Sequence, residues 1–158
     1  MSYLALKYLH LLSMVVLFGT GLGSAWYKWM ADRGGKLAQI CETNRLVVKA
    51  DWLFTTPTIL IQPVTGMLMA ARAGLPLDTP WIALSLILYA LAGACWLPVV
   101  ALQIRMHRLS RQALDSARPL PPLYHRQARL WFWLGVPAFL AMTAVVFLMV
   151  FKPAWTMP

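Results

Sequence analysis

The chain of 158 residues is 60% hydrophobic and 12% charged, and 14 Lys and Arg against 5 Asp and Glu give it a formal net charge of +9 at pH 7. Soluble domains are about half apolar and about one quarter charged, so this composition excludes an ordinary water-soluble domain and indicates an integral membrane protein. The positive charge does not indicate nucleic-acid binding, because no nucleic-acid-binding motif or interleaving of aromatic and basic residues accompanies it.

The first apolar run, residues 4–27, is long enough to cross a bilayer and carries Lys7 and His10 near its start. A bilayer core of about 30 Å takes about 20 helical residues to span, and ionisable side chains within that length are costly and usually functional. His10 and Gly21 fall on one face by helical spacing. The run also holds small residues that let a partner helix or a flat ligand approach closely, namely Gly19, Gly21 and Gly23.

The second predicted span, residues 52–71, follows a mixed segment that we expect to be helical at the membrane interface. Polar and small residues recur along one side of the span at helical spacing, which predicts that this side faces protein: Asp51, Thr55, Thr58, Gln62, Thr65, Gly66 and Met69. Pro57 and Pro63 each remove a backbone donor and should bend the helix. Pro63 also frees the carbonyl of Ile59 for another donor.

The third and fourth predicted spans, residues 81–104 and 131–151, differ in pattern. One face of the third span carries Ser85, Tyr89, Ala92, Trp96 and Gln103, whereas the fourth is uniformly apolar. The segment between them should begin as a helix, break at the prolines and form a solvent-exposed connection: Pro119, Pro121 and Pro122. The sequence therefore predicts an all-α integral membrane fold, an antiparallel bundle of four transmembrane helices in a single domain over residues 1–158.

The basic residues predict the orientation of this bundle. Arg72 is the one basic residue between spans two and three, whereas the other two connections carry Lys28, Arg33, Lys36, Arg45 and Lys49, and Arg105, Arg108, Arg111, Arg118, Arg126 and Arg129. By the positive-inside rule these two connections are cytoplasmic and both termini are periplasmic. The lipid bilayer is the expected environment, and the small-residue faces predict homo-oligomers.

His10 is the one histidine within a predicted span, and it suggests a haem site. A neutral imidazole nitrogen can ligate haem iron, Gly21 would leave room for the porphyrin, and Lys7 would meet a propionate. Gln62 and Tyr89 lie within roughly three helical turns of the same outer end and could shape that pocket. Alternatively, His10 is a packed side chain that bonds a carbonyl or Gln62, and Lys7 extends to the membrane surface.

Two further hypotheses stay open. The polar faces of spans two and three could only hold the helices together, which would make this a structural or accessory protein without a cofactor. Nine methionines and Cys95 invite a copper-handling role, although the methionines are spread over the chain, where filling gaps is their commoner use. No nucleophile with an adjacent base and no phosphate-binding loop is recognisable in the sequence.

Three stretches carry a resemblance to known families: KYLHLLSMVVLFGTGLGSAW, DWLFTTPTILIQPVTG and PWIALSLILYALAGACWLPVVALQIR. Together they resemble a bacterial family of short predicted integral membrane proteins of unknown function, which implies location in the inner membrane. The first span is more distantly similar to that of the HemJ-type membrane protoporphyrinogen oxidases, in which a first-span histidine is associated with haem b, and His10 matches it. This resemblance implies a haem-dependent membrane oxidoreductase that transfers electrons or oxidises a hydrophobic, porphyrinogen-like or quinol-like substrate. The lysine that those oxidases carry after a tryptophan early in the third span is absent after Trp81.

Overall fold

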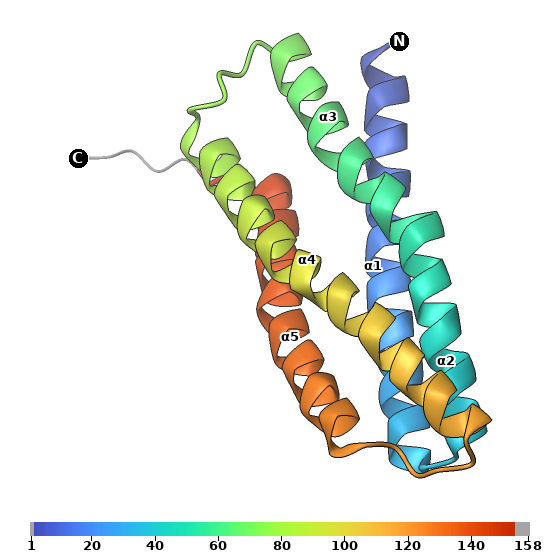
Figure 1. Ribbon diagram of the computed structural model, residues 1–158. Coiled ribbons are helices and arrows are strands. Elements are labelled where there is room, and N and C mark those ends of the chain that lie inside the picture. The colour runs from blue at the N-terminus through green and yellow to red at the C-terminus, as the bar shows by residue number, and fades with distance from the viewer. Residues whose placement is uncertain (1, 154–158) are drawn as a thin grey trace.

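The computed structural model describes residues 2–153, which form helices and no strand (Figure 1). The elements in chain order are α1 Tyr3–Gly34, α2 Leu37–Ala50, the π-helical stretch η1 Asp51–Thr55, α3 Thr56–Arg72, α4 Pro80–Asp115 and α5 Pro122–Phe151. Because α2, η1 and α3 follow one another without a break, the described residues contain four helices that are long and apolar enough to cross a membrane. The predicted all-α, four-span fold is confirmed.

Local sequence signals set the helix ends. The Ser2 side chain accepts a hydrogen bond from the Ala5 amide and caps α1, and Gly35 ends that helix in the left-handed conformation at φ 68°. Pro80 and Pro122 stand in the first turns of α4 and α5, where a missing N–H costs nothing. The connections are short, so each long helix returns antiparallel to the one before it (Figure 1).

Backbone hydrogen bonding changes near both prolines of the second span. Two residues before Pro57 the helix widens into the π turn of η1, where the Thr56 side chain donates to the Asp51 carbonyl at 2.9 Å. Pro63 has no N–H to offer the Ile59 carbonyl, and the Tyr89 hydroxyl of α4 donates to that carbonyl at 2.5 Å. The prediction that Pro63 frees this acceptor for another donor is confirmed.

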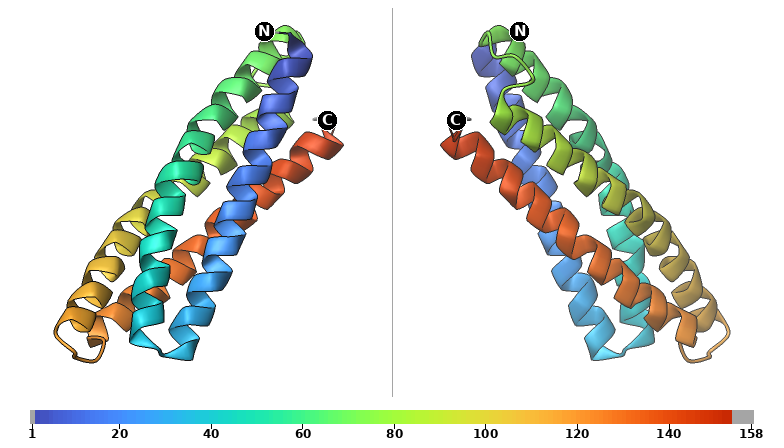
Figure 2. Two further views of the ribbon diagram at one scale, coloured as in Figure 1. Left: turned by 90° about the vertical axis from the view of Figure 1, so that its right-hand side faces the viewer. Right: turned by 90° about the vertical axis from the view of Figure 1, so that its left-hand side faces the viewer.

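The four long helices are arranged as two pairs. α1 packs along α3, and α4 packs along α5, while α2 contacts α4 near the basic connections. Figure 1 shows the pairs close together at the end that holds the α1–α2 and α4–α5 connections and apart at the other end, and Figure 2 shows the helices running along the long axis. A buried apolar cluster lies at the end where the two pairs are close together, which we call the closed end: Ala31, Ile40, Val99, Leu102, Met106, Tyr124 and Trp131.

The helices extend beyond the predicted spans at the basic end. Residues 105–130 were predicted to begin as a helix, break at the prolines and form an exposed connection. α4 continues to Asp115 and a mostly exposed break follows over residues 116–121, as predicted, but α5 already begins at Pro122. Tyr124 is fully buried, because its ring packs into the apolar cluster between the helices. The start of α1 and the end of α5 lie at the opposite end of the bundle from the basic connections (Figure 1).

Candidate functional site

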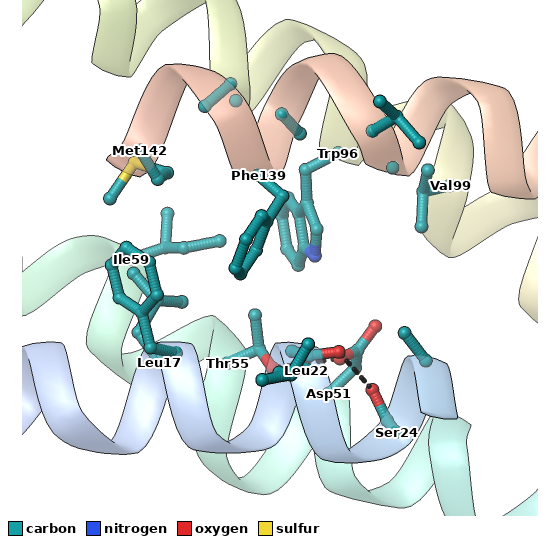
Figure 3. Close-up of a pocket in the computed structure, with 18 of the residues that line it drawn as sticks. Leu17, Leu22, Ser24, Asp51, Thr55, Ile59, Trp96, Val99, Phe139 and Met142 are labelled. Carbon is teal, nitrogen blue, oxygen red and sulfur yellow. Dashed lines mark hydrogen bonds between the residues drawn. The ribbon is translucent and has the colours of Figure 1, made fainter. Parts of the chain in front are cut away.

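A cavity of about 350 Å³ lies between the α1–α3 pair and the α4–α5 pair. Figure 3 shows side chains reaching into it from both sides, with Trp96 and Phe139 opposite Asp51. The volume is in the range of small-molecule sites. The lining is mostly apolar, and six of its residues are aromatic: Phe18, Tyr89, Trp96, Trp131, Phe132 and Phe139.

The two ends of the cavity differ in chemistry. Toward the basic connections the lining includes the polar side chains of Asp51 and Gln103, whereas the other end is apolar and includes Met142. At this apolar end the rings of Phe18 on α1 and Phe139 on α5 meet edge to face, with centroids 5.7 Å apart. The cavity is therefore amphipathic along its length, with its polar end in the half of the bundle nearest the basic connections.

Three of the residues that line the cavity carry a buried polar atom without a hydrogen-bond partner. The atoms are Nε1 of Trp96, Oε1 of Gln103 and Nε1 of Trp131, and they belong to a set of five such side-chain atoms in residues 2–153. The Gln103 and Trp131 side chains are only 5% and 8% exposed, so bulk water does not satisfy them. Since each of these atoms has less than 1 Å² of accessible surface, they are buried within the walls of the cavity and do not face its interior.

Asp51 places one carboxylate at the polar end. Its Oδ1 accepts a hydrogen bond of 2.8 Å from the Thr55 hydroxyl, and Gln103 provides a further side-chain interaction. The widened turn of η1 carries both Asp51 and Thr55, and both are buried. Among the described residues that line the cavity, Asp51 is the one acidic side chain and none is Lys, Arg or His.

The cavity is open on the side between α1 and α5. Leu22 on α1 and Leu140 on α5 line it and are 60% and 61% exposed, so they stand at its edge. Both lie within helices that are apolar enough to span a bilayer, where exposed leucines face lipid. A molecule dissolved among the acyl chains could therefore enter the cavity from the side.

His10 lies outside this cavity, between α1 and α3. Its Nδ1 is 2.8 Å from Thr65 Oγ1, and Gln62 Nε2 donates to the His10 backbone carbonyl at 2.7 Å and to Ser13 Oγ at 2.6 Å. A Cβ on Gly66 would come within 3.4 Å of the His10 ring, so the imidazole packs directly on the α3 backbone. The polar face of span two is therefore used for contact with α1, as its pattern predicted.

The hydrogen bonds of the Thr65 hydroxyl favour one tautomer of the His10 ring. It donates its single proton to the Ile61 carbonyl at 2.6 Å, so toward His10 it can only accept. His10 Nδ1 is then the protonated nitrogen of the neutral ring, and Nε2 keeps a free lone pair. By its chemistry Nε2 could ligate a metal, in the arrangement usual for ligand histidines.

The structure divides the five residues that the sequence assigned to a haem pocket. His10 and Gln62 meet at the α1–α3 contact, Gly21 and Tyr89 line the cavity, and Lys7 is exposed. The exposure of Lys7 fits a lysine that extends to the membrane surface. A single haem pocket that uses all five does not fit this arrangement, because His10 and Gln62 are not among the residues of the cavity.

Metal sites receive no support from the side chains around His10. In residues 2–153 no group of three or more His, Cys, Asp or Glu lies close enough together to hold a metal ion. Cys41 and Cys95 are both free thiols, and Cys95 is half-buried on α4. Haem ligation by His10 and copper handling by methionines and Cys95 stay predictions.

The small residues of α1 border a second groove, of about 440 Å³, between α1 and the α2–η1–α3 helix. Gly19 and Gly23 line it together with the larger side chains Tyr27, Leu46 and Phe54. These larger side chains are exposed, so the groove is shallow and faces outward. Self-association through this face stays a prediction.

A cluster that the sequence did not reveal joins all four long helices at the closed end. The inner polar cluster consists of Lys28 and Asp32 on α1, Asn44 on α2, Ser110 on α4 and Tyr124 on α5. Lys28 is 1% exposed, and its Nζ donates to Asp32 Oδ2 and Asn44 Oδ1, both at 2.9 Å, and to the Tyr124 hydroxyl at 3.0 Å. Three acceptors match the three N–H groups of a lysine.

The other members of the inner polar cluster are paired as well. Asn44 Nδ2 donates to Ser110 Oγ at 3.2 Å and to the Tyr124 hydroxyl at 3.0 Å, and that hydroxyl donates to Asp32 Oδ1 at 2.6 Å. The Lys28 ammonium also lies 5.5 Å from the centre of the Trp131 ring, which lines the cavity. Because its members form hydrogen bonds with one another, the cluster links the long helices at the closed end. It lies next to the cavity, on the far side of the Trp131 ring.

Sequence reasoning missed this cluster for an identifiable reason. Lys28 follows an apolar span, which is where the positive-inside rule expects exposed cations. Asp32, one helical turn after Lys28, was a signal of pairing, but nothing in the pattern pointed to Asn44 or Tyr124. Trp96 and Gln103 were placed on the inward face of span three, but their missing partners are visible only in three dimensions.

Comparison with known proteins identifies the family. A family model described as predicted integral membrane protein, DUF2269, matches residues 4–153. No curated protein and no solved structure matches the chain. The predicted resemblance to a family of short integral membrane proteins is thereby confirmed, and the similarity to HemJ-type oxidases is not shown.

Proposed function

The chain belongs to the DUF2269 family of predicted integral membrane proteins, and we propose that it takes up a hydrophobic small molecule from the bilayer into the cavity between its two helix pairs. The carrying observation is the cavity itself, with a mostly apolar and aromatic lining and the polar side chains of Asp51 and Gln103 at one end. Apolar pockets with a few convergent polar groups are the usual form of small-molecule sites.

The open side of the cavity supports entry from the membrane. Leu22 and Leu140 border it and are exposed at membrane depth, so a hydrophobic ligand need not leave the bilayer to enter. The sequence had suggested a porphyrinogen-like or quinol-like substrate, and the cavity fits that class in its apolar and aromatic lining. Oxidation of such a substrate is not part of the proposal.

Haem binding is a second candidate function, and one observation favours it. The hydrogen bond to Thr65 leaves His10 Nε2 unprotonated, as an axial ligand requires. If haem is bound, His10 would hold it and the haem would supply one-electron chemistry. The five predicted pocket residues do not surround one space, so the cavity is the better-supported site.

The proposal is tested by what copurifies with the protein. A Cβ on Gly93 or Gly135 would meet no atom within 4 Å, and both glycines line the cavity, so Gly93→Leu and Gly135→Leu fill it without clashing with the backbone. We expect hydrophobic compounds extracted from the detergent-purified wild-type protein to fall at least about fivefold in both variants, as a loss of about 1 kcal/mol in binding would give.

Gly19→Leu is the matched control. Gly19 also has open space around a Cβ but lines the outer groove and not the cavity, so this variant should retain the compound. Equal recovery from the wild-type protein and both cavity variants would overturn the proposal, as would a wild-type protein that carries no compound. Unfolding midpoints of the four proteins show whether each variant is folded.

A further inference from the structure

The one carboxylate in the described lining of the cavity indicates the charge of its ligand. Resting on the proposed function, we infer that the ligand is a lipophilic monocation, a largely apolar molecule whose single positive charge is held at Asp51. The inference follows from the lack of a cationic partner for Asp51, from the aromatic rings opposite it and from the apolar opening of the cavity.

Asp51 is a buried acidic side chain without a cationic partner in the described part of the chain. It is 5% exposed, and it takes part in none of the ion pairs found among residues 2–153. Its Oδ1 accepts one hydrogen bond, from Thr55, and Gln103 adds a side-chain interaction. A carboxylate in an apolar site is stable as an anion only where a cation or several donors compensate its charge. A bound cation would supply that compensation.

Aromatic rings stand across the cavity from this carboxylate. Figure 3 shows Asp51 and Thr55 on one side of the cavity and Trp96 and Phe139 on the other. Cations bind favourably to aromatic rings, and to tryptophan the most strongly. A cation between the two sides would therefore meet the carboxylate on one side and aromatic rings on the other.

The charge of Lys28, behind the lining, is already compensated. Its ammonium lies 5.5 Å from the centre of the Trp131 ring and donates to the Asp32 carboxylate at 2.9 Å. Because the two opposite charges are in direct contact, the pair adds little net field at the cavity. Asp51 is then the net charge that a ligand meets, and one carboxylate balances one positive charge.

The rest of the cavity suits the apolar body of such a cation. The end away from Asp51 is apolar and includes Met142, and the open side is bordered by the exposed Leu22 and Leu140. An anionic head would find no Lys, Arg or His in the described lining and would be repelled by Asp51. The positive charge therefore lies at the polar end, and a hydrocarbon part extends toward the bilayer.

Three tritium-labelled probes with the same decyl tail test the charge preference. Decyltrimethylammonium is cationic, decanol is neutral and decyl sulfate is anionic, and a scintillation proximity assay on the immobilised protein in a nonionic detergent measures the binding of each. We expect decyltrimethylammonium to bind at least about tenfold more tightly than either of the others. This comparison uses the wild-type protein alone, so it does not depend on the folding of any variant.

Variants of Asp51 test where the charge is held. Asp51→Asn removes the charge and keeps an oxygen that can accept from Thr55. It should weaken the binding of decyltrimethylammonium about a hundredfold, the effect of removing one partner of a buried charge pair, and leave the binding of decanol unchanged. Asp51→Glu keeps the charge and should bind the cation to within about fivefold of the wild-type protein.

The matched controls are one acidic residue outside the cavity and one glycine within it. Asp115 is exposed and pairs with Arg111 away from the lining, so Asp115→Asn should bind the cation as the wild-type protein does. Gly93→Leu fills the cavity and should bind none of the three probes.

The outcomes separate the charge of the ligand from the site. Three results would overturn the cation assignment and leave the cavity as the site: decanol or decyl sulfate binding as tightly as decyltrimethylammonium, wild-type binding of the cation by Asp51→Asn, or equal weakening of the cation and decanol in that variant. A wild-type protein that binds no cation would overturn the assignment as well, and the copurified compounds would still test the proposed function. Binding of every probe that is unchanged in Gly93→Leu would overturn the cavity itself, and the proposed function with it.

Discussion

Lys28 on α1 and Tyr124 on α5, 96 residues apart in the chain, meet in a hydrogen bond of 3.0 Å inside the closed end of the bundle. The Lys28 ammonium also lies 5.2 Å from the centre of the Tyr124 ring. Because α1 and α5 belong to different helix pairs, this contact helps to hold the pairs together at one end while the cavity lies between them.

We expect Lys28→Met to destabilise the protein by about 3 kcal/mol, because it leaves the buried Asn44 Oδ1 and the half-buried Asp32 carboxylate without the ammonium. Reversible unfolding in mixed detergent micelles would measure this loss of unfolding free energy. Arg111→Met breaks the exposed pair with Asp115 and should cost less than about 1 kcal/mol. Equal losses of unfolding free energy in the two variants would show that the inner polar cluster does not hold the helices together.

Tyr124→Phe should be milder, at about 1 to 3 kcal/mol, since it removes one hydroxyl and keeps the ring in the apolar cluster. That hydroxyl accepts from Lys28 and Asn44 and donates to Asp32. The same unfolding assay measures the loss. A Tyr124→Phe protein as stable as the wild type would mean that water replaces the hydroxyl.

Leucine should be tolerated at Gly93 and not at Gly66. A Cβ at Gly66 already comes within 3.4 Å of the His10 ring, so Gly66→Leu would force α1 and α3 apart at a cost of about 1 to 3 kcal/mol. Gly93 has no atom within 4 Å of the same position. Thermal unfolding midpoints of the two variants, measured in one detergent, test this difference. A midpoint for Gly93→Leu below that of Gly66→Leu would contradict the open cavity.

The haem prediction is checked by the visible spectrum of protein purified from haem-replete cells. We expect no Soret band, and we expect His10→Ala to reduce stability by about 1 to 3 kcal/mol, because Thr65 would lose its buried partner. A Soret band in the wild-type protein that disappears in His10→Ala would instead establish His10 as a haem ligand. Gln62→Leu, which removes the bond to the His10 carbonyl, is the companion variant for stability.

The orientation in the membrane is tested by cysteine labelling in a background without Cys41 and Cys95. Leu75 lies in the α3–α4 connection and Arg118 in the α4–α5 connection, and both are exposed. We expect a membrane-impermeant maleimide applied from the periplasmic side to label Leu75→Cys, and Arg118→Cys only after the membrane is opened. The reverse pattern would invert the predicted topology.

The candidate site could be anticipated in part. The inward faces of spans two and three were identified from helical spacing, and Gln62, Tyr89 and Gly21 all lie at contacts or at the cavity. Which of these residues would meet His10 could not be predicted, because depth along a helix places residues at one level of the membrane without saying which pair of helices they join. His10 and Gln62 lie between α1 and α3, whereas Gly21 faces the other pair.

By itself, the sequence determined the membrane class, the order of the spans and the inward faces, because each depends on local composition and helical periodicity. It also determined that Pro63 would leave the Ile59 carbonyl open, since the missing N–H is a covalent property. Only the tertiary structure decided that the Tyr89 hydroxyl donates to this carbonyl and that Lys28 is buried against Tyr124. It also decided that three atoms are left without partners, namely Nε1 of Trp96, Oε1 of Gln103 and Nε1 of Trp131. These depend on how two helix pairs meet at one end, and periodicity shows that a face is buried but not which side chains it meets.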